Sequence, residues 1–410
     1  MSALARLFLG EKKVVSGSDR TPSDITRALQ AEGVTFSDTQ VAGNIAEGTD
    51  LVVYTEAMPK DHEELVEARK RGIETVNYFE ALGMVANEYY LIAVAGSHGK
   101  TTTTAMLIDI FEEASLDPSG IVGSLRSKTK SNYRKGKGKY FIVEACEYRR
   151  DFLSLTPDIL VITNIEHEHV DYYRDLREVQ EAFREFACQV REGGAVVVNF
   201  GGPNIAPSLE SVTARVIDYG RYFDPMLALK VPGVHNQMDA AAATAAAELV
   251  GVSRQTSRSA LEKFGGTWRR FEYKGEVNGA PVYDDYGHHP TEITATIHGA
   301  QELYPERKIT LVFQSHTYSR THTLFNDFAD ALALADRIIV LPIYAAREEN
   351  ESGVSHTKLA EAVHGKGKEA FALDTFEEAT ASVRQTVGEN DLVLVMGAGT
   401  ITEVASRLVP

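Results

Sequence analysis

The segment Leu91-Ile-Ala-Val-Ala-Gly-Ser-His-Gly-Lys-Thr-Thr-Thr-Thr104 decides the fold of this 410-residue chain. Its apolar start, Leu91 to Ala95, predicts a buried strand. The glycine turn Gly96-Ser-His-Gly99 follows, and residues 105–114 read as a helix, so backbone N–H groups and the helix N-terminus converge on one point. Such a point attracts phosphate. The segment therefore predicts an α/β domain that binds a phosphate group where a strand ends.

The residues of the turn have distinct expected roles. Lys100 is expected to reach the β- and γ-phosphates of a nucleotide, and the Thr101 hydroxyl to bind Mg²⁺. Val94 stands where the longer GxxxxGK[ST] loop has its first glycine, so the spacing is a shorter GxxGKT variant. A helix merely capped by a lysine and threonines is the alternative, which the strand and the two glycines disfavour. Further contacts to the cofactor are expected from Gly96, Ser97, His98, Gly99 and Thr102.

Short apolar runs alternate with amphipathic segments along nearly the whole chain, which is typical of α/β sheets covered on both faces. Breaks occur near Asn87 and at the glycine pair Gly265-Gly266. They divide the chain into three expected domains, residues 1–88, 89–266 and 267–410. Strands are expected at residues 13–16, 51–54, 91–95, 140–144, 159–163, 194–199, 281–284, 309–313, 337–341 and 392–396.

Composition excludes several classes of protein. The chain has 42 Lys and Arg against 58 Asp and Glu, a net charge of −16, which disfavours nucleic acid or an anionic membrane as partner. Its two cysteines, Cys146 and Cys188, lie far apart and form no CxxC motif, which disfavours a disulfide framework and favours a reducing compartment. No apolar run is long enough to span a membrane, and no signal-peptide pattern is present. A cytoplasmic protein is expected.

Several motifs together resemble one enzyme family. The turn GSHGKTTTT resembles the ATP loop of the Mur ligases, the ATP-dependent amide-forming enzymes of peptidoglycan precursor synthesis. The segments at residues 313–321 and 343–346, with DDYGHHPTE at 284–292, resemble most closely the family members that add L-alanine. The resemblance spans nearly the whole chain. The other matching segments, in the family's order, are TNIEHEHVD at 163–171, GVHN at 233–236 and RRFE at 269–272.

The resemblance implies a fold and a reaction. It implies three α/β domains: a Rossmann-like N-terminal domain for a UDP-sugar, a central P-loop ATPase domain with a mostly parallel sheet, and a Rossmann-like C-terminal domain for the amino acid. ATP and Mg²⁺ are the implied cofactors, and UDP-N-acetylmuramate and L-alanine the implied substrates. ATP phosphorylates the lactyl carboxylate, and the amine of L-alanine then attacks the acyl phosphate. A monomer or weak homodimer is expected.

The resemblance also implies a metal site. Glu144 resembles the family's magnesium glutamate and would hold Mg²⁺ together with Thr101. His169 takes the place of the family's second-metal histidine, with Glu166 and Asp171 placed to orient it or its waters. Another histidine stands two residues before His169, and such a pair of histidines is also compatible with a zinc site. Magnesium bound with phosphate needs mainly oxygen ligands, which favours the magnesium interpretation.

Two further places in the chain are implied to contact the nucleotide. His235 and Asn236 resemble the family's adenine-contacting pair, although an asparagine that caps a helix is equally compatible with the sequence. The family's second asparagine is Asp239 here. Arg269 and Arg270 follow the interdomain glycines, so one of them would reach the γ-phosphate when the C-terminal domain closes. Arg270 is favoured for this catalytic role. The alternative is that both arginines are ordinary surface charges.

The block at residues 284–292 supplies the remaining assignments. The resemblance assigns the ribose of ATP to Asp284 and Asp285, and the L-alanine carboxylate to Tyr286, His288 and Arg320, with His288 also catalytic. Thr317 stands where the family usually has a basic residue, so the sequence leaves the identity of the acceptor undecided. A ligase that attaches a preformed peptide to the same sugar nucleotide is one alternative, and a non-catalytic nucleotide-binding relative is another.

The resemblance is incomplete at the N-terminus. The family normally opens with a strand and a GxGGxGMS loop that cradles the UDP diphosphate, whereas Met1-Ser-Ala-Leu-Ala5 resembles only the end of that loop. Either the true start lies upstream of Met1, or the sugar nucleotide binds differently. Ser18 and Asp19 are expected to meet a ribose hydroxyl. Asn132 and Arg134 are expected to touch substrate from a basic loop, which alternatively is a solvated charge run.

Overall fold

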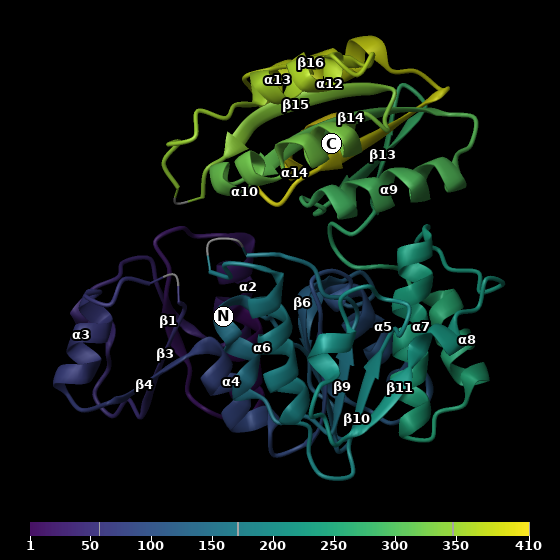
Figure 1. Ribbon diagram of the computed structural model, residues 1–410. Helices are drawn as coiled ribbons and strands as arrows, with labels where there is room; N and C mark the ends of the chain where they lie inside the picture. The colour runs from purple at the N-terminus through teal and green to yellow at the C-terminus, as the bar shows by residue number, and fades with distance from the viewer. Residues whose placement is uncertain (57, 170–171, 347, 410) are drawn as a thin grey trace.

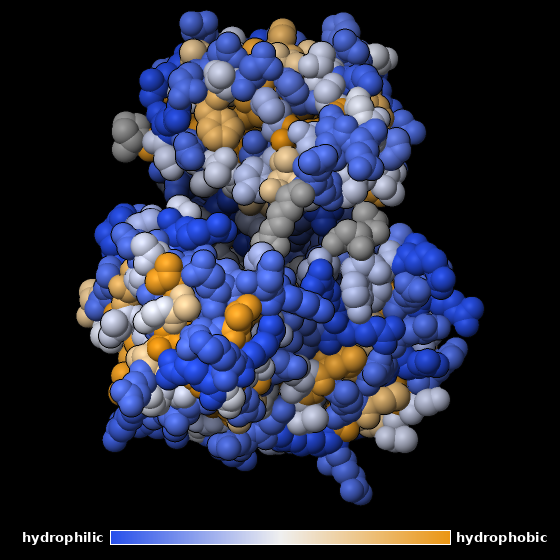
Figure 2. All heavy atoms as spheres, turned by 90° about the vertical axis from the view of Figure 1, so that its left-hand side faces the viewer, coloured by the Kyte–Doolittle hydropathy of each residue, from blue (hydrophilic) through white to orange (hydrophobic). Residues whose placement is uncertain are grey.

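The computed structural model describes residues 1–56, 58–169, 172–346 and 348–409. Its elements form three α/β domains in chain order: the N-terminal domain from α1 to α4, the central domain from β5 to α8 and the C-terminal domain from β12 to α14 (Figure 1). The C-terminal domain lies above the other two, and Figure 2 shows a waist between the two lobes. Among the described residues, every helix is too short or too polar to cross a bilayer.

The central sheet is built around β5 (Tyr90–Ala95), the apolar run before the phosphate turn. Its strand order is β11-β10-β9-β5-β8-β6-β7. Among the described strands of this sheet only β7 runs antiparallel to its neighbour, so the sheet is mostly parallel, as expected. The other strands are β6 (Ser119–Arg126), β7 (Ser131–Arg134), β8 (Tyr140–Glu144), β9 (Ile159–Ile162), β10 (Ala195–Val198) and β11 (Arg215–Asp218).

Helices cover both faces of this sheet (Figure 1). One face packs against α5 (Lys100–Glu113), α7 (Val234–Leu249) and α8 (Arg254–Lys263). Residues 240–247 of α7 are almost all buried alanines, whose small side chains let α7 approach α5 closely. The other face packs against α6 (Leu176–Cys188) and against helices of the N-terminal domain. Short 3₁₀ helices lie at η1 (Ala42–Asn44), η2 (Tyr148–Ser154), η3 (Ala206–Leu209) and η4 (Tyr219–Tyr222).

The N-terminal domain contains two separate parallel strand pairs. β1 (Ser16–Ser18) pairs with β2 (Thr35–Ser37), and β3 (Leu51–Tyr54) pairs with β4 (Glu74–Asn77). The strand expected at residues 13–16 therefore begins later, because Val14 is fully exposed and cannot contribute to a core. The helices of this domain are α1 (Ser2–Gly10), α2 (Asp24–Glu32), α3 (Glu63–Lys70) and α4 (Tyr78–Ala86).

The C-terminal sheet has the order β12-β13-β17-β14-β15-β16, with β12 antiparallel to β13. Its strands are β12 (Glu272–Val277), β13 (Ala280–Asp285), β14 (Lys308–His316), β15 (Arg337–Tyr344), β16 (Glu369–Ala372) and β17 (Asp391–Met396). One face packs against α9 (Pro290–Leu303), α11 (Phe325–Leu332) and α12 (His356–His364), and the other against α13 (Phe376–Thr386) and α14 (Thr402–Leu408). The short α10 (Tyr318–Thr323) follows β14.

The segment between the two large sheets is tied to both. Thr267 forms an isolated bridge with Arg126 of β6, and the Trp268 amide donates to the Leu125 carbonyl at 2.8 Å. The Tyr286 amide, after β13, donates to the Arg269 carbonyl at 2.7 Å. Residues that follow β5 and β9 line one cavity together with Gly266, Thr267 and Arg270 of this segment, and the carboxyl ends of parallel strands are where open α/β sheets bind their ligands.

Candidate active site

The phosphate turn requires its two glycines. Gly96 and Gly99 have φ angles of 137° and 83°, in the region that side chains rarely adopt. A Cβ at Gly96 would collide with the Thr163 side chain, and one at Gly99 with the Asp239 carboxylate. A contact from the segment after β9 also holds the turn in place, because the His98 amide donates to the Asn164 side-chain oxygen at 2.9 Å.

Lys100 folds back over this turn. Its ammonium group donates to the carbonyls of Gly96 and Ser97 and lies 3.0 Å from a carboxylate oxygen of Glu147. Burial works to lower the pKa of Lys100, but the Glu147 carboxylate outweighs it and raises that pKa above its usual value. Burial likewise opposes the charge on Glu147, yet Lys100 and His169 lower the pKa of Glu147 to about 2. Both groups are therefore charged at neutral pH.

Glu147 is a site residue that the sequence did not single out. It is 1% exposed, and its Oε1 accepts from both Lys100 and Nε2 of His169, each at 3.2 Å. The available signal was its position, three residues beyond Glu144 and just after the end of β8. The structure thus places His169 against Glu147, whereas Asp171 lies outside the described residues.

Thr101 and Glu144 meet as expected from the sequence. The Thr101 hydroxyl donates to Glu144 Oε1 at 3.0 Å, and the Gly123 amide donates to Glu144 Oε2 at 2.7 Å. A side chain at Gly123 would press on this carboxylate, so the backbone of β6 approaches it closely. A hydroxyl and a carboxylate side by side at the start of α5 offer the oxygen ligands that Mg²⁺ prefers, and these residues fit that ion.

A cavity of about 370 Å³ opens between the central and C-terminal domains beside the turn. It is large enough for a nucleotide-sized ligand. Burial lowers the pKa of His235 to about 4, so this imidazole is neutral at neutral pH. The lining includes residues from both domains, among them His98, Thr101, Thr102, His235, Asn236, Asp239, Arg270, Asp285 and Glu292.

The two adjacent arginines have different surroundings. Arg269 is 3% exposed, lies 3.3 Å from Asp284 and donates to the carbonyls of Gly397 and Gly399, inside the C-terminal domain. Arg270 instead lines the cavity and lies 3.4 Å from Glu292.

The expected roles of the neighbouring acids need a corresponding correction. Asp284 is fully buried against Arg269 and Thr402, so the structure does not bring it to the cavity as an acceptor for a ribose. Asp285 does line the cavity, but its carboxylate accepts from the Phe271 amide at 2.7 Å and from the Gly287 amide at 2.6 Å. Its visible role is to shape the turn after β13.

His98 connects the two domains at the turn. Its Nδ1 lies 3.3 Å from Glu292 Oε1 of the C-terminal domain, and its Nε2 lies 3.4 Å from Glu166 Oε2 of the central domain. Burial works against the charged imidazole, but these carboxylates outweigh it and raise the pKa of His98 to about 10. Glu292 also contacts Arg270 and caps α9. This one carboxylate, to which the sequence analysis gave no role, therefore links the phosphate turn, Arg270 and the start of α9.

Comparison with known proteins identifies this arrangement. Three family models match in order: "Mur ligase family, catalytic domain" at residues 1–90, "Mur ligase middle domain" at 94–225 and "Mur ligase, glutamate ligase domain" at 269–399. The chain belongs to the Mur ligase family. The fold class expected from the sequence, three α/β domains with a mostly parallel central sheet, is confirmed.

Relatives within the Mur ligases match over their full length. The chain is 39% identical to the UDP-N-acetylmuramate--L-alanine ligase of Agathobacter rectalis, with 100% of this chain and 95% of the relative covered. It is 38% identical to the enzyme of that name from Clostridium novyi, with 98% and 93% covered. The structure of the UDP-N-acetylmuramate-alanine ligase MurC from Thermotoga maritima matches with a TM-score of 0.81 and 27% identity, covering 100% of this chain and 95% of that one. A murein peptide ligase from Psychrobacter arcticus, at 22% identity and a TM-score of 0.70, shares the fold.

The residues that the Mur ligase resemblance assigns to the amino acid lie together in the C-terminal domain. The rings of Tyr286 and His288 are 5.4 Å apart, and those of His288 and His316 are 5.7 Å apart. Burial lowers the pKa of His288 to about 4. Arg320 donates to Glu168 Oε2 of the central domain at 3.3 Å.

The residues assigned to the UDP-sugar lie apart from this cavity. Arg134 is committed to Glu112 at 2.7 Å and Asp117 at 2.6 Å, so the structure does not present it to a substrate. Asn132 donates to the Ser2 hydroxyl at 3.2 Å, at the start of α1. Ser18 donates to Glu64 at 2.9 Å, and the Asp19 carboxylate accepts from the Thr21 amide at 3.0 Å.

Asp239 is expected to make the stability of the protein depend on pH. It is buried in the first turns of α7, and burial raises its pKa to about 8. Because the folded pKa exceeds the unfolded value of about 3.9, ionisation disfavours the fold, and stability falls as pH rises from about 4 to about 8. Asp239→Asn is therefore expected to stabilise the protein by about 2–4 kcal/mol at pH 7, and by little at about pH 4. Urea unfolding of both proteins at the two pH values measures this, and an equal difference at both would contradict it.

Proposed function

We propose that this protein joins L-alanine to the lactyl carboxylate of UDP-N-acetylmuramate in the cytoplasm, with ATP and Mg²⁺, through an acyl phosphate, releasing ADP and phosphate. The observation that carries the proposal is the match, over the whole chain, to ligases named for this reaction. The shared cavity that joins the phosphate turn to Arg270 supports it, because the chemistry requires a nucleotide and an acceptor between two domains.

The first step depends on positioning and charge neutralisation. Backbone amides of the turn and the N-terminus of α5 bind the phosphates. Lys100, which is paired with Glu147 in this structure, leaves that carboxylate and pairs with the phosphates instead. Thr101 and Glu144 would hold Mg²⁺, which neutralises phosphate charge when it is bound. Arg270, from the C-terminal side, supplies a second cation toward the transferred phosphoryl group.

His288 supplies a candidate base for the second step. An ammonium group cannot attack an acyl phosphate until it loses a proton. His288 is neutral at neutral pH, and its Nδ1 lies 3.1 Å from the Tyr286 carbonyl, a contact that places the proton on Nδ1. The ammonium group loses its first proton to solvent. Nε2 of His288 then carries the free lone pair that accepts a hydrogen bond from the uncharged amine and takes its second proton as the C–N bond forms and the nitrogen becomes strongly acidic. Arg320 is the nearby cation for the carboxylate of the amino acid.

The acceptor is the sharpest test of this proposal. Phosphate release with UDP-N-acetylmuramate, ATP and Mg²⁺ is expected to depend on L-alanine, with kcat/KM at least about 100-fold higher than for a tripeptide that begins with L-alanine, since the carboxylate of the tripeptide lies too far from its amine to reach the cation assigned to it, Arg320. Coupled phosphate detection with each acceptor measures it.

Two results would contradict the proposal. A preference for the tripeptide would favour the peptide-adding ligase, which Thr317 leaves open. No phosphate release with either acceptor, from protein that still binds ATP, would favour the non-catalytic relative.

A further inference from the structure

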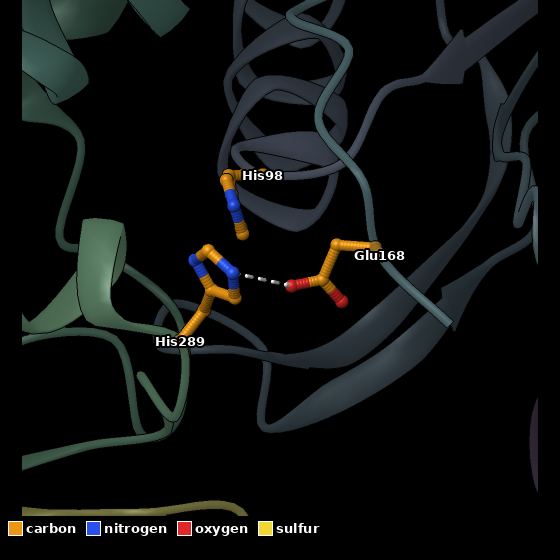
Figure 3. Close-up of side chains that lie close together, drawn as sticks. All are labelled: His98, Glu168 and His289. Carbon is orange, nitrogen blue, oxygen red and sulfur yellow. Dashed lines mark ion pairs between the residues drawn. The ribbon is translucent and has the colours of Figure 1, made fainter. Parts of the chain in front are cut away.

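Three side chains from two domains converge beside the phosphate turn. His98 belongs to the turn, Glu168 to the segment after β9, and His289 is the N-cap residue of α9. Figure 3 shows them pointing toward one another, and one ligand atom from each lies within 4.8 Å of the others. Glu168 is 7% and His289 8% exposed, so this cluster is shielded from solvent.

Two of the facing atoms of the cluster lack a hydrogen bond. Within the described part of the chain, Nε2 of His98 and Oε1 of Glu168 are buried and make none, and the neighbour of that Nε2 is the Glu166 carboxylate, an ion-pair contact at 3.4 Å. Nε2 of His289 lies 3.8 Å from Oε1 of Glu168, which is too long for a hydrogen bond. Buried polar atoms are normally paired, so two unpaired atoms that lie with a third ligand atom within 4.8 Å of one another indicate room for a shared partner.

The outer contacts of the cluster are those of metal-binding histidines. Such histidines usually donate their second ring nitrogen to a carboxylate, which orients the ring. Nδ1 of His98 lies 3.3 Å from Glu292 Oε1, whereas Nδ1 of His289 lies 3.9 Å from Glu166 Oε2, which is an ion-pair distance and too long for a hydrogen bond. Without a metal, Nδ1 of His289 accepts from the Thr291 amide at 3.3 Å; coordination through Nε2 would place the proton on Nδ1, on the side of Glu166.

The charges around the cluster also suit a cation. Glu166, Glu168 and Glu292 surround it, and Arg320 engages only Oε2 of Glu168, which leaves Oε1 for another ligand.

We propose that His98, Glu168 and His289 form an interdomain site for a divalent transition metal of the Zn²⁺ or Co²⁺ class. Two imidazoles and one carboxylate are the ligand set that Zn²⁺ takes in open tetrahedral sites, whereas Mg²⁺ prefers the oxygens of Thr101 and Glu144. A metal here ties the phosphate turn directly to α9. It therefore holds the C-terminal domain against the central domain, and it inhibits any step that requires the two domains to separate.

Cobalt binding tests the site without reference to turnover. Metal-free protein titrated with Co²⁺ at about pH 8, in excess Mg²⁺, is expected to develop the visible absorption of tetrahedral Co²⁺ with one equivalent bound, and Zn²⁺ is expected to displace it. His289→Ala and Glu168→Gln are each expected to weaken binding at least about tenfold. Glu168→Gln keeps the side-chain volume, so it remains informative if His289→Ala, which removes the α9 cap, fails to fold.

Two control variants separate this site from other ligands. His364→Ala removes an exposed histidine of the C-terminal domain and is expected to bind Co²⁺ as the parent does. Cys146→Ser disrupts the other cluster of possible ligands, Cys146, Glu147 and His169, and is expected to leave the spectrum unchanged, without a thiolate charge-transfer band in either protein. Absence of the visible band, or a band that survives Glu168→Gln undiminished, would overturn the proposal.

Discussion

Lys100→Ala is expected to reduce ATP-dependent phosphate release by about a thousandfold or more. The ammonium group folds over the turn against Glu147, and among the described residues the cavity lining holds no lysine that could replace it. Its removal takes away the positive charge that balances the phosphates where the transferred group departs. Single-turnover phosphate release at saturating ATP isolates this effect from nucleotide binding.

The same substitution has a second consequence, which must be separated from the first. Removing Lys100 leaves the Glu147 carboxylate buried beside His169 alone, and breaking a buried ion pair from one side destabilises a protein by about 3–5 kcal/mol. Lys100→Ala with Glu147→Gln removes both charges and is expected to restore most of that stability while remaining inactive.

This double substitution decides between two explanations of the loss. If the double variant regained activity along with stability, Lys100 would act through the fold and its role toward phosphate would be wrong. Glu147→Gln alone is the matched control: it keeps the lysine, removes its resting partner, and is expected to retain measurable turnover.

Local patterns predicted much of the fold. The expected strands at residues 51–54 and 140–144 coincide with β3 and β8, and the glycine turn lies between β5 and α5 as its sequence indicates. These features depend on residues adjacent in the chain, where apolar runs and glycines have direct local effects. The strand expected at residues 13–16 was displaced because Val14 and its neighbours find no partner surface to pack against.

Residues whose roles depend on distant partners were harder to predict. Glu147 belongs to none of the motifs, and Glu292 ends the block at 284–292 without an assigned role, yet each binds a cation brought from another segment. Arg134 looked available in a basic loop, but Glu112 and Asp117, from α5 and the turn after it, already neutralise it. Pairing across a fold is a tertiary property, so the charge pattern along one segment did not reveal it.

The adjacent pair Arg269 and Arg270 is expected to separate structure from catalysis. Arg270→Met removes the cation that lines the cavity and is expected to lower kcat by about 10²–10³-fold, with little change in stability. Arg269→Met leaves the fully buried Asp284 without its ion-pair partner and is expected to cost about 3–5 kcal/mol of folding stability.

Two measurements on each variant, urea unfolding and single-turnover phosphate release, resolve the pair. Arg269→Met with Asp284→Asn is expected to recover stability, because no buried charge then lacks a partner, and to keep turnover close to that of the parent. Arg270→Met with Glu292→Gln is not expected to recover turnover, because Arg270→Met removes a charge that stabilises the transition state and Glu292→Gln does not replace it. If Arg269→Met lost turnover while remaining as stable as the parent, the γ-phosphate role would belong to Arg269, and the C-terminal domain would have to rearrange on closing to free it from Asp284.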